Sequence, residues 1–305
     1  MLTTVFSQVM ILMIMIAVGF IAAKAKIMTA EGARCCTDIV LIISTPCVII
    51  KSLIREYSKD IMKSLAFAIF ITLIVQVLMI ALSYIILHSK DKARERVLRF
   101  GTIFANCGFM SLPLQQVILG ADGTLYGSAY VIMFNLVIWS YGVYLISGDK
   151  KYIKPKKLFI NPGLIGLAIG LVIFIFSIPI PKILNSAIDY MSALYTPLPM
   201  LIIGYHLAQN NLLTAFKDAK CLFAVLLRMI IYPLAVLGFL YLIGVRGTLL
   251  VSVIISVSAP VAAITTMFSS KYGADTPLSV DMVSLSTVAT SVTMPIVITL
   301  AQLLA

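Results

Sequence analysis

The chain has 305 residues, of which 61% are hydrophobic and only 11% are charged, and its mean hydropathy is +1.08. A soluble domain carries about 25% charged residues and roughly 45–50% apolar ones, so this composition excludes an ordinary soluble fold and indicates a chain that crosses a membrane several times. The formal net charge of +11 does not indicate nucleic acid as a partner. The Lys and Arg residues lie mostly in short loops between apolar segments, where they set orientation in the bilayer.

A spanning helix needs about 20 predominantly apolar residues. By this measure we predict an all-α membrane protein with ten transmembrane helices and no soluble domain. The predicted spans cover residues 5–23, 35–54, 62–87, 98–119, 124–146, 160–178, 187–208, 219–243, 248–269 and 280–304.

The basic residues are divided unevenly between the two sides. Most Lys and Arg residues lie in or beside the loops that follow the odd-numbered segments, so the positive-inside rule places those loops in the cytoplasm and both termini outside. No basic residue precedes the first segment, whereas Lys24 and Lys26 follow it, which argues against a cleaved signal peptide. We therefore expect a multi-pass protein of the plasma membrane.

Two halves of the chain show the same spacing of polar residues and prolines. Asp38 and Thr45-Pro46 recur as Asp189 and Thr196-Pro197, both displaced by 151 residues. We predict a first five-helix repeat at 1–146, a basic cytoplasmic linker at 147–159 and a second five-helix repeat at 160–305. Because five is odd, the two repeats insert with opposite orientation, and such repeats place a site near the membrane midplane.

Two of the apolar segments carry residues that fit poorly in a continuous membrane helix. One contains Asn106-Cys-Gly-Phe-Met-Ser-Leu-Pro113 and the other Ser256-Val-Ser-Ala-Pro260. Proline lacks an N–H and clashes with the carbonyl four residues back, and each freed backbone group in hydrocarbon needs a new partner. Interrupted helices mark the sites of many transporters, whereas the alternative is an ordinary proline kink.

If both helices are interrupted, their second halves begin near Pro113 and Pro260. The free N–H groups are then expected at about Leu114 to Gln116 and at Val261 to Ala263. A helix N-terminus carries roughly +0.5 of an elementary charge, so two converging ends favour an anion such as a carboxylate.

Three polar side chains are further candidates for this site. Asn106 lies two helical turns before Pro113, and Asn135 lies in the middle of the fifth segment, where a bond between helices is the alternative role. Arg228 lies about 13 Å along its segment at 1.5 Å per residue, near the middle of the membrane. Charge at that depth suggests function, and the alternative is an arginine that bonds backbone carbonyls between helices.

Other chemistry has little support. No catalytic set, metal-ligand cluster or cofactor motif stands out, and the five cysteines are interpreted as small packing residues. All twelve acidic residues lie away from the middle of a span, so ion coupling through a central carboxylate is disfavoured, while sodium held by carbonyls and hydroxyls stays open.

Several motifs together resemble the auxin efflux carrier family in its bacterial branch, over nearly the whole chain. They are Asn106 to Pro113-Leu114, Gly127-Ser128 to Ile138-Trp139, Pro260 with Met267-Phe268 and Lys271 to Asp275, and Met294-Pro295-Ile296. The resemblance implies ten helices in two inverted repeats, with helices 4 and 9 broken and crossing at Pro113 and Pro260. It also implies a transport domain that moves against a scaffold of segments 1, 2, 6 and 7, and a homodimer.

For bacterial members the resemblance implies organic acids such as malate or malonate as well as auxin-like compounds. We therefore expect a secondary transporter, and an exporter, of a small organic anion that works by alternating access. The predicted substrate-binding set is Asn106, Pro113, Leu114, Asn135, Pro260, Val261 and Arg228. The alternatives are a sodium- or proton-coupled symporter of the same fold and a membrane sensor that binds a ligand without moving it.

Overall fold

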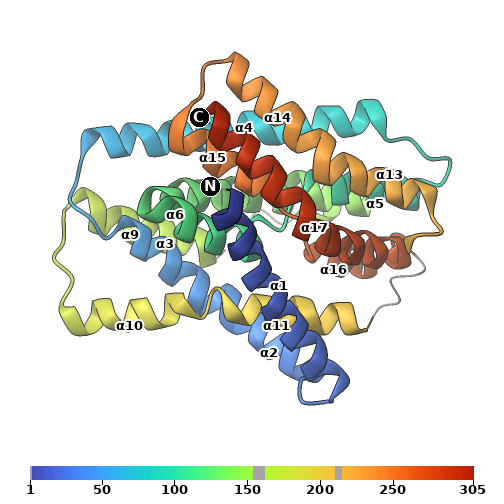
Figure 1. The fold of residues 1–305 in the computed structure, drawn as a ribbon, viewed down its shortest axis with the longest axis horizontal. Coiled ribbons are helices and arrows are strands. Elements are labelled where there is room, and N and C mark those ends of the chain that lie inside the picture. Colours follow the sequence, from blue (N-terminus) through green and yellow to red (C-terminus); the bar gives the residue numbers. More distant parts are fainter. Residues whose placement is uncertain (1, 154–161, 210–214) are drawn as a thin grey trace.

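The computed structural model describes residues 2–153, 162–209 and 215–305, and every regular element in these ranges is a helix (Figure 1). The predicted all-α class is confirmed. The elements run in the order α1 (Leu2–Lys24), α2 (Ala30–Ile39), η1 (Val40–Ser44), α3 (Thr45–Leu53), α4 (Lys59–Ile86), α5 (Lys92–Ile103), η2 (Cys107–Ser111), α6 (Leu112–Val137), η3 (Ile138–Gly142), α7 (Val143–Ser147), η4 (Lys150–Tyr152), α9 (Pro162–Ile175), α10 (Lys182–Ala193), α11 (Pro197–Ala208), α13 (Ala219–Leu226), η5 (Leu227–Ile231), α14 (Tyr232–Leu242), α15 (Gly247–Val257), α16 (Ile264–Tyr272) and α17 (Thr276–Leu304).

Within the described residues, six helical runs are long and apolar enough to cross a membrane, which makes this a multi-pass membrane protein. They are Thr3–Lys24, Ala30–Leu53, Lys59–Ile86, Cys107–Ser147, Ala219–Leu242 and Thr276–Leu304. The run Cys107–Ser147 contains a sharp turn at Gly120, whose φ of 66° lies in the left-handed region that glycine tolerates. This turn falls between the predicted spans 98–119 and 124–146.

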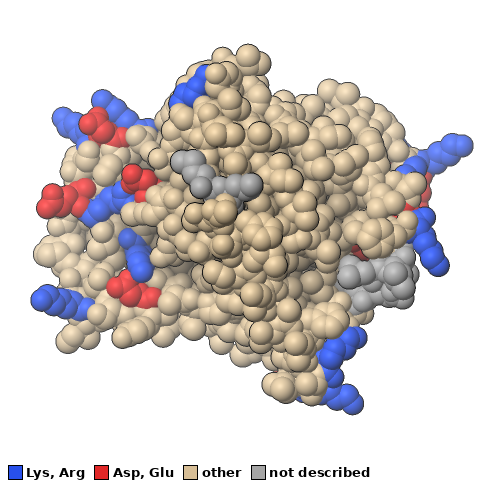
Figure 2. Space-filling view, in the orientation of Figure 1, with Lys and Arg blue, Asp and Glu red and all other residues tan. Residues whose placement is uncertain are grey.

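Charged side chains gather mainly at the two ends of the long axis, and a broad uncharged surface lies between them (Figure 2). Many large apolar side chains are exposed on the molecule, including Ile14, Ile85 and Phe176. Exposure of these side chains to water would be unfavourable, whereas lipid tails can cover them, because the tails are as apolar as the side chains.

Three prolines inside long helical runs follow a widened π turn. The π turns η1, η2 and η5 each end two residues before a proline, namely Pro46, Pro113 and Pro233. A π turn contains one extra residue, so it moves the carbonyl that would otherwise clash with the proline ring. The helical run therefore continues through these prolines.

The first predicted break is consequently misplaced. α5 ends at Ile103 and the helix resumes at Cys107, so the interruption is at Phe104–Asn106, and Pro113 is the second residue of α6. The expectation of a helix break at Pro113 is wrong, because η2 absorbs that proline. The second predicted break is at the expected place, since Pro260 lies between the end of α15 and the start of α16.

The predicted span 187–208 is also divided. α10 ends at Ala193, and α11 begins at Pro197, the proline of the repeated Thr-Pro pair. The proline at the first helical position starts a new helix, because its missing N–H would have no partner there in any case. Its counterpart Pro46 also lies in the first turn of a helix, α3.

The helices α1, α2, α3, α9, α10 and α11 pack against one another, and in Figure 1 they occupy the lower part of the molecule. α1 and α11 make the closest pair. A Cβ built on Gly19 would overlap the backbone of Leu201, and one built on Gly204 would overlap the carbonyl oxygen of Ile16. The main chains of the two helices therefore touch at both glycines.

Of the predicted basic linker at 147–159, the described part is short. Gly148 ends α7 in the left-handed conformation, and Asp149 caps the 3-10 turn η4 and pairs with Lys151 at 2.9 Å. Lys154, Lys156 and Lys157 lie outside the described residues.

Replacing Gly204 with alanine should lower stability, because the new methyl group has no room against α1. We expect a loss of about 1–3 kcal/mol, as for other overpacked contacts, read as a lower unfolding temperature in detergent. The matched control is Gly238→Ala in α14, where an added Cβ meets no atom within 4 Å. That variant should be neutral or slightly more stable, and equal losses in the two variants would contradict the close pairing of α1 and α11.

Candidate functional site at the two helix interruptions

The two interruptions lie side by side and bond to each other through the backbone. Asn106 N–H donates to Pro260 O at 2.7 Å, and Ala262 N–H donates to Phe104 O at 3.0 Å. Ala105 and Val261 form an isolated antiparallel bridge. All these residues are buried, so the two segments satisfy each other's backbone groups where no water reaches them.

This pairing changes which amide groups are available. Val261 N–H donates to the Ser286 hydroxyl of α17 at 3.0 Å, and Ala262 N–H is used by Phe104. The expectation of free amides at Val261 and Ala262 is therefore wrong, because a buried break must find partners for its own N–H groups. On the other segment the first helical amides belong to Cys107 and the residues after it, whereas Leu114 lies further inside the helix.

Both helix starts beside the interruptions carry buried polar side chains that do not cap the helix or have no partner. Asn106 is the N-cap residue of η2, is only 8% exposed, and makes no side-chain capping hydrogen bond. Thr265 in the first turn of α16 is fully buried, and its hydroxyl has no partner. Ser258, between α15 and Pro260, has an equally unpaired hydroxyl. These groups can bond a bound molecule without first breaking another contact.

Arg228 holds the opposite ends of the interrupted helices. Its side chain is fully buried, and its guanidinium donates to Thr102 O at 3.3 Å, Val257 O at 2.6 Å and Ala259 O at 3.0 Å. Thr102 lies in the last turn of α5, and Val257 ends α15. The alternative role considered from the sequence, an arginine that bonds backbone carbonyls between helices, matches these contacts. Nε has no partner.

A polar seam joins the helix after the first interruption to α15. Gln115 donates from Nε2 to Ser256 Oγ at 2.8 Å and accepts from Ser252 Oγ at 2.7 Å. Ser111 Oγ donates to Ile255 O at 3.1 Å. Sequence reasoning missed this seam, although a glutamine and closely spaced serines inside apolar segments were a usable signal.

Asn135 lies near the interruption but bonds within its own helix. Its Nδ2 donates to Val131 O at 2.8 Å, so the bond between helices considered from the sequence is not made. The preceding residue, Phe134, packs edge-on against Phe104 of the first interruption, with ring centroids 5.8 Å apart. The helix that carries Asn135 therefore passes beside the site.

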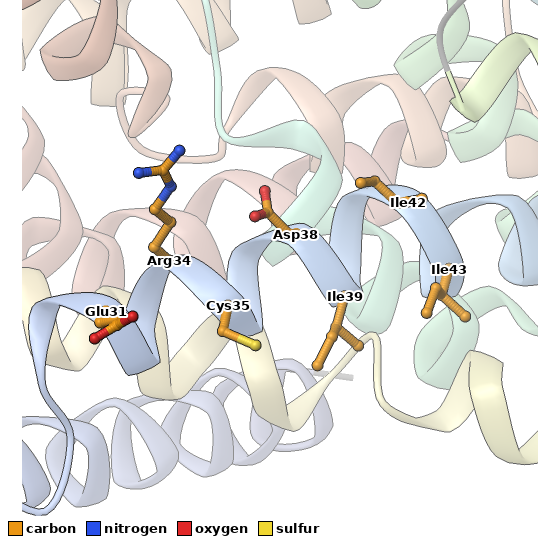
Figure 3. A pocket seen from close by; sticks show the side chains of 7 residues that line it. All are labelled: Glu31, Arg34, Cys35, Asp38, Ile39, Ile42 and Ile43. Atoms are coloured by element: carbon orange, nitrogen blue, oxygen red, sulfur yellow. The ribbon is translucent and has the colours of Figure 1, made fainter.

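A pocket of about 520 Å³ lies elsewhere, on the outer surface of α2 and η1. It is lined by Glu31, Arg34, Cys35, Asp38, Ile39, Ile42 and Ile43. Figure 3 shows these side chains on successive turns of one helical run, and none belongs to an interrupted segment. We do not assign the functional site to this pocket, because all of its described lining residues come from this one helical run.

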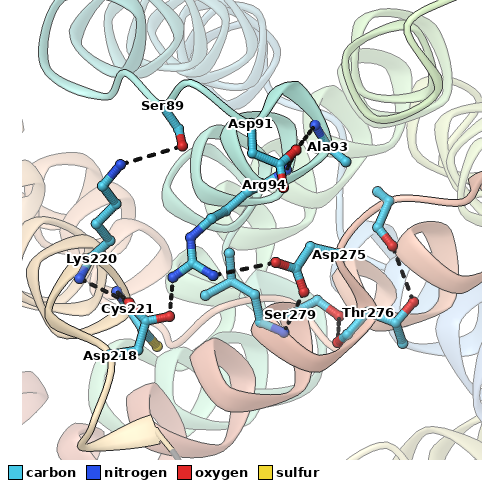
Figure 4. Close-up of polar contacts among 12 residues, drawn as sticks. Ser89, Asp91, Ala93, Arg94, Asp218, Lys220, Cys221, Asp275, Thr276 and Ser279 are labelled. Atoms are coloured by element: carbon cyan, nitrogen blue, oxygen red, sulfur yellow. Dashed lines mark hydrogen bonds and ion pairs between the residues drawn. The ribbon is translucent and has the colours of Figure 1, made fainter.

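Three aspartates that cap helix starts meet around one arginine at one end of the molecule (Figure 4). Asp91 caps α5, Asp218 caps α13 and Asp275 caps α17. The guanidinium of Arg94 pairs with Asp218 and, at 3.4 Å, with Asp275. The starts of three helices are thereby held together. An aspartate just before an apolar segment is a recognised N-cap signal, so the caps were foreseeable from the sequence, although their meeting point was not.

Comparison with known proteins identifies transport proteins as relatives of this chain. A family model described as membrane transport protein matches residues 4–157 and 153–298. An uncharacterised transporter of Methanothermobacter thermautotrophicus is 23% identical over 292 residues, 94% of this chain and 95% of the relative, and one of Methanocaldococcus jannaschii is 24% identical over 290 residues, 92% and 93%. Auxin efflux carrier component 1 of Arabidopsis thaliana is 27% identical over 121 residues, 38% of this chain and 20% of that protein.

The Arg94 cluster predicts a pH dependence of stability. Partial burial raises the pKa of Asp218, but hydrogen bonds from Arg94 and from the Cys221 and Lys220 N–H groups, with the charge of Arg94, hold that pKa below its ordinary value. A lowered folded-state pKa stabilises the fold above the unfolded pKa of about 3.9, and this contribution is lost as the pH falls through the folded value.

Asp218→Asn should therefore unfold at a lower temperature than the wild type at pH 7, since it keeps the cap but loses the charge. The difference should shrink as the pH falls below about 4. Asp60→Asn, at an exposed aspartate in the first turn of α4, is the control and should match the wild type throughout. A deficit that is the same at pH 7 and pH 3 would contradict the charge argument.

Proposed function

Because this chain belongs to the membrane transport protein family and is similar over part of its length to an auxin efflux carrier component, we propose that it is a secondary transporter. It exports a small organic anion by alternating access. The family is one of transport proteins, not of enzymes. The single observation that carries the proposal is the pairing of the two interrupted helices, Asn106 to Pro260 and Ala262 to Phe104.

Two helix N-termini begin at this pairing, at Cys107 and at Ile264. Each brings roughly +0.5 of an elementary charge into a region from which water is excluded, and this favours an anion. Asn106, whose side chain makes no capping bond, and Thr265, whose hydroxyl is unpaired, supply hydrogen-bond donors at the two starts. We place the carboxylate of the substrate here, with Pro260 and Val261 as the wall of the site and Asn135 on the neighbouring helix. Pro113 and Leu114 shape the helix behind it.

The proposed topology has ten spans in two inverted five-helix repeats that cross at the interruptions. Six runs satisfy the length criterion within the described residues, and the interrupted or shorter spans fail it individually. α5 with the helix up to Gly120, and α15 with α16, each make one span from two short helices. The repeated Thr-Pro pair, whose prolines lie in the first turn of α3 and of α11, supports the internal repeat.

We propose that the group containing α1, α2, α3, α9, α10 and α11 is the scaffold and that it carries the contact of a homodimer. The helices that bear the interruptions then move against it. The tight glycine contacts inside this group support a rigid body. We further propose that the protein lies in the plasma membrane. The distribution of Lys and Arg supports an orientation with both termini outside and the residue 147–159 linker in the cytoplasm.

Membrane potential alone can drive such an export. For an anion that leaves a cell with a negative interior, the potential contributes about 2.3 kcal/mol per charge per 100 mV. The absence of acidic residues from the middle of the predicted spans motivates this uncoupled mechanism. A sodium- or proton-coupled symporter and a sensor that does not transport its ligand are the competing functions.

Counterflow in vesicles tests the function. Purified protein is reconstituted with a panel of unlabelled mono- and dicarboxylates inside, and uptake of each labelled compound is measured with and without an imposed potential. We expect exchange of at least one carboxylate, and net efflux that responds to voltage without a sodium or proton gradient. Binding without exchange would identify a sensor. Efflux that ignores voltage but stops when an ion gradient is removed would identify a symporter.

Asn106→Ala should weaken binding of the carboxylate found in that assay by about tenfold or more, because a hydrogen bond to a charged group contributes about 1.5–3 kcal/mol. Thermal-shift titration in detergent measures the change. Asn185→Ala in α10, on the proposed scaffold, is the matched control and should bind like the wild type. Unchanged affinity in a folded Asn106→Ala protein would remove this residue from the site.

A further inference from the structure

Charge inside the described part of the protein is confined to a few side chains. Two of the buried charged residues, Glu95 and Arg99, form an ion pair at 3.1 Å, so their charges neutralise each other. Arg228 is the remaining buried charge among the Asp, Glu, Lys and Arg residues of the described ranges, and no carboxylate there pairs with it. The charge of the site therefore depends on Arg228 and on the helix ends around it.

Four helix ends meet at the interruptions. α5 and α15 end there, at Ile103 and Val257, and the helices that start at Cys107 and Ile264 begin there. Each C-terminus carries roughly −0.5 and each N-terminus roughly +0.5 of an elementary charge. Without any side chain the four ends sum to about zero, so the helix ends alone create no net preference for an anion.

Arg228 removes this balance. Its hydrogen bonds all go to carbonyls at or just after the ends of α5 and α15, on Thr102, Val257 and Ala259. One positive charge at those carbonyls offsets the two C-terminal ends, which together amount to about −1. The two N-terminal ends, about +1 in total, are then left without a counterpart.

We propose that Arg228 is the residue that determines the charge specificity of the site, and that the site consequently accepts an anion with a single negative charge. This inference rests on the proposed function. Arg228 acts through the helix ends and does not need to touch the substrate. One negative charge neutralises the N-terminal ends, whereas a second would have no partner in a buried region, where an unpaired charge is costly.

Matched pairs of acids test this. Malonate, succinate and glutarate are compared with their monoamides, which have nearly the same shape but one negative charge fewer at pH 7. Thermal-shift titration of the purified wild type measures binding, and counterflow in vesicles measures exchange. We expect any monoamide that binds to do so at least about tenfold more tightly than its diacid.

Variants then assign the effect to Arg228. Arg228→Lys keeps the charge and should keep the preference for the monoamide, even with weaker binding, since lysine lacks the planar fork of arginine. Arg228→Gln removes one positive charge from the site, so it should weaken binding of the monoamide at least tenfold and binding of the diacid still more, and the preference for the monoamide should rise. If Arg228→Gln does not fold, the wild-type preference still tests the single-charge specificity, because a wild type that binds the diacids more tightly overturns the proposal.

The outcomes separate the two proposals. Tighter binding and exchange of the diacids by the wild type would overturn the single-charge specificity and leave the proposed transport function standing. A folded Arg228→Gln protein with an unchanged preference would overturn the role of Arg228. If neither acids nor monoamides bind or exchange, the proposed function fails, and this inference fails with it.

Discussion

Backbone groups that are removed from water must find partners, and this requirement shapes the centre of the molecule. Two helices stop inside an apolar bundle, which exposes amides and carbonyls where each unmet hydrogen bond costs several kcal/mol. The chain meets this demand in three ways. The interruptions bond to each other at Asn106–Pro260 and Ala262–Phe104, Ser286 accepts from Val261, and Arg228 bonds the carbonyls at the helix ends. A break in a helix becomes stable only because another break lies beside it.

The same requirement for hydrogen-bond partners determines which groups remain available to a ligand. The amides of Val261 and Ala262 in the second interruption are bonded within the fold, so the proposed recognition falls to the starts of the two following helices and to polar side chains there, such as Asn106 and the unpaired hydroxyl of Thr265. The seam of Gln115 with Ser252 and Ser256 keeps one helix start fixed against α15. The proposed site is thus assembled from four helix ends in two segments that are far apart in sequence.

Much of the architecture follows from patterns in the sequence, and the exceptions have physical causes. Apolar length predicts the helical class, and Pro260 marks the second interruption correctly. Pro113 misleads, because a π turn admits a proline without a break, and no local pattern of residues signals that turn in advance. The role of Asn135 was equally hidden, since an asparagine can bond its own helix or a neighbour with the same sequence around it. Arg228 was recognisable as unusual, but its three carbonyl partners come from distant segments and become visible only in the fold.

The glycine contact between α1 and α11 has a consequence for the order of assembly. α1 leaves the ribosome long before α11, which belongs to the second half of the chain. Domains generally form from the N-terminus during synthesis, and contacts between distant segments form late. The glycine face of α1 therefore stays unpaired in the lipid until α11 has been made, and a nascent chain that stops before α11 leaves this face without its partner.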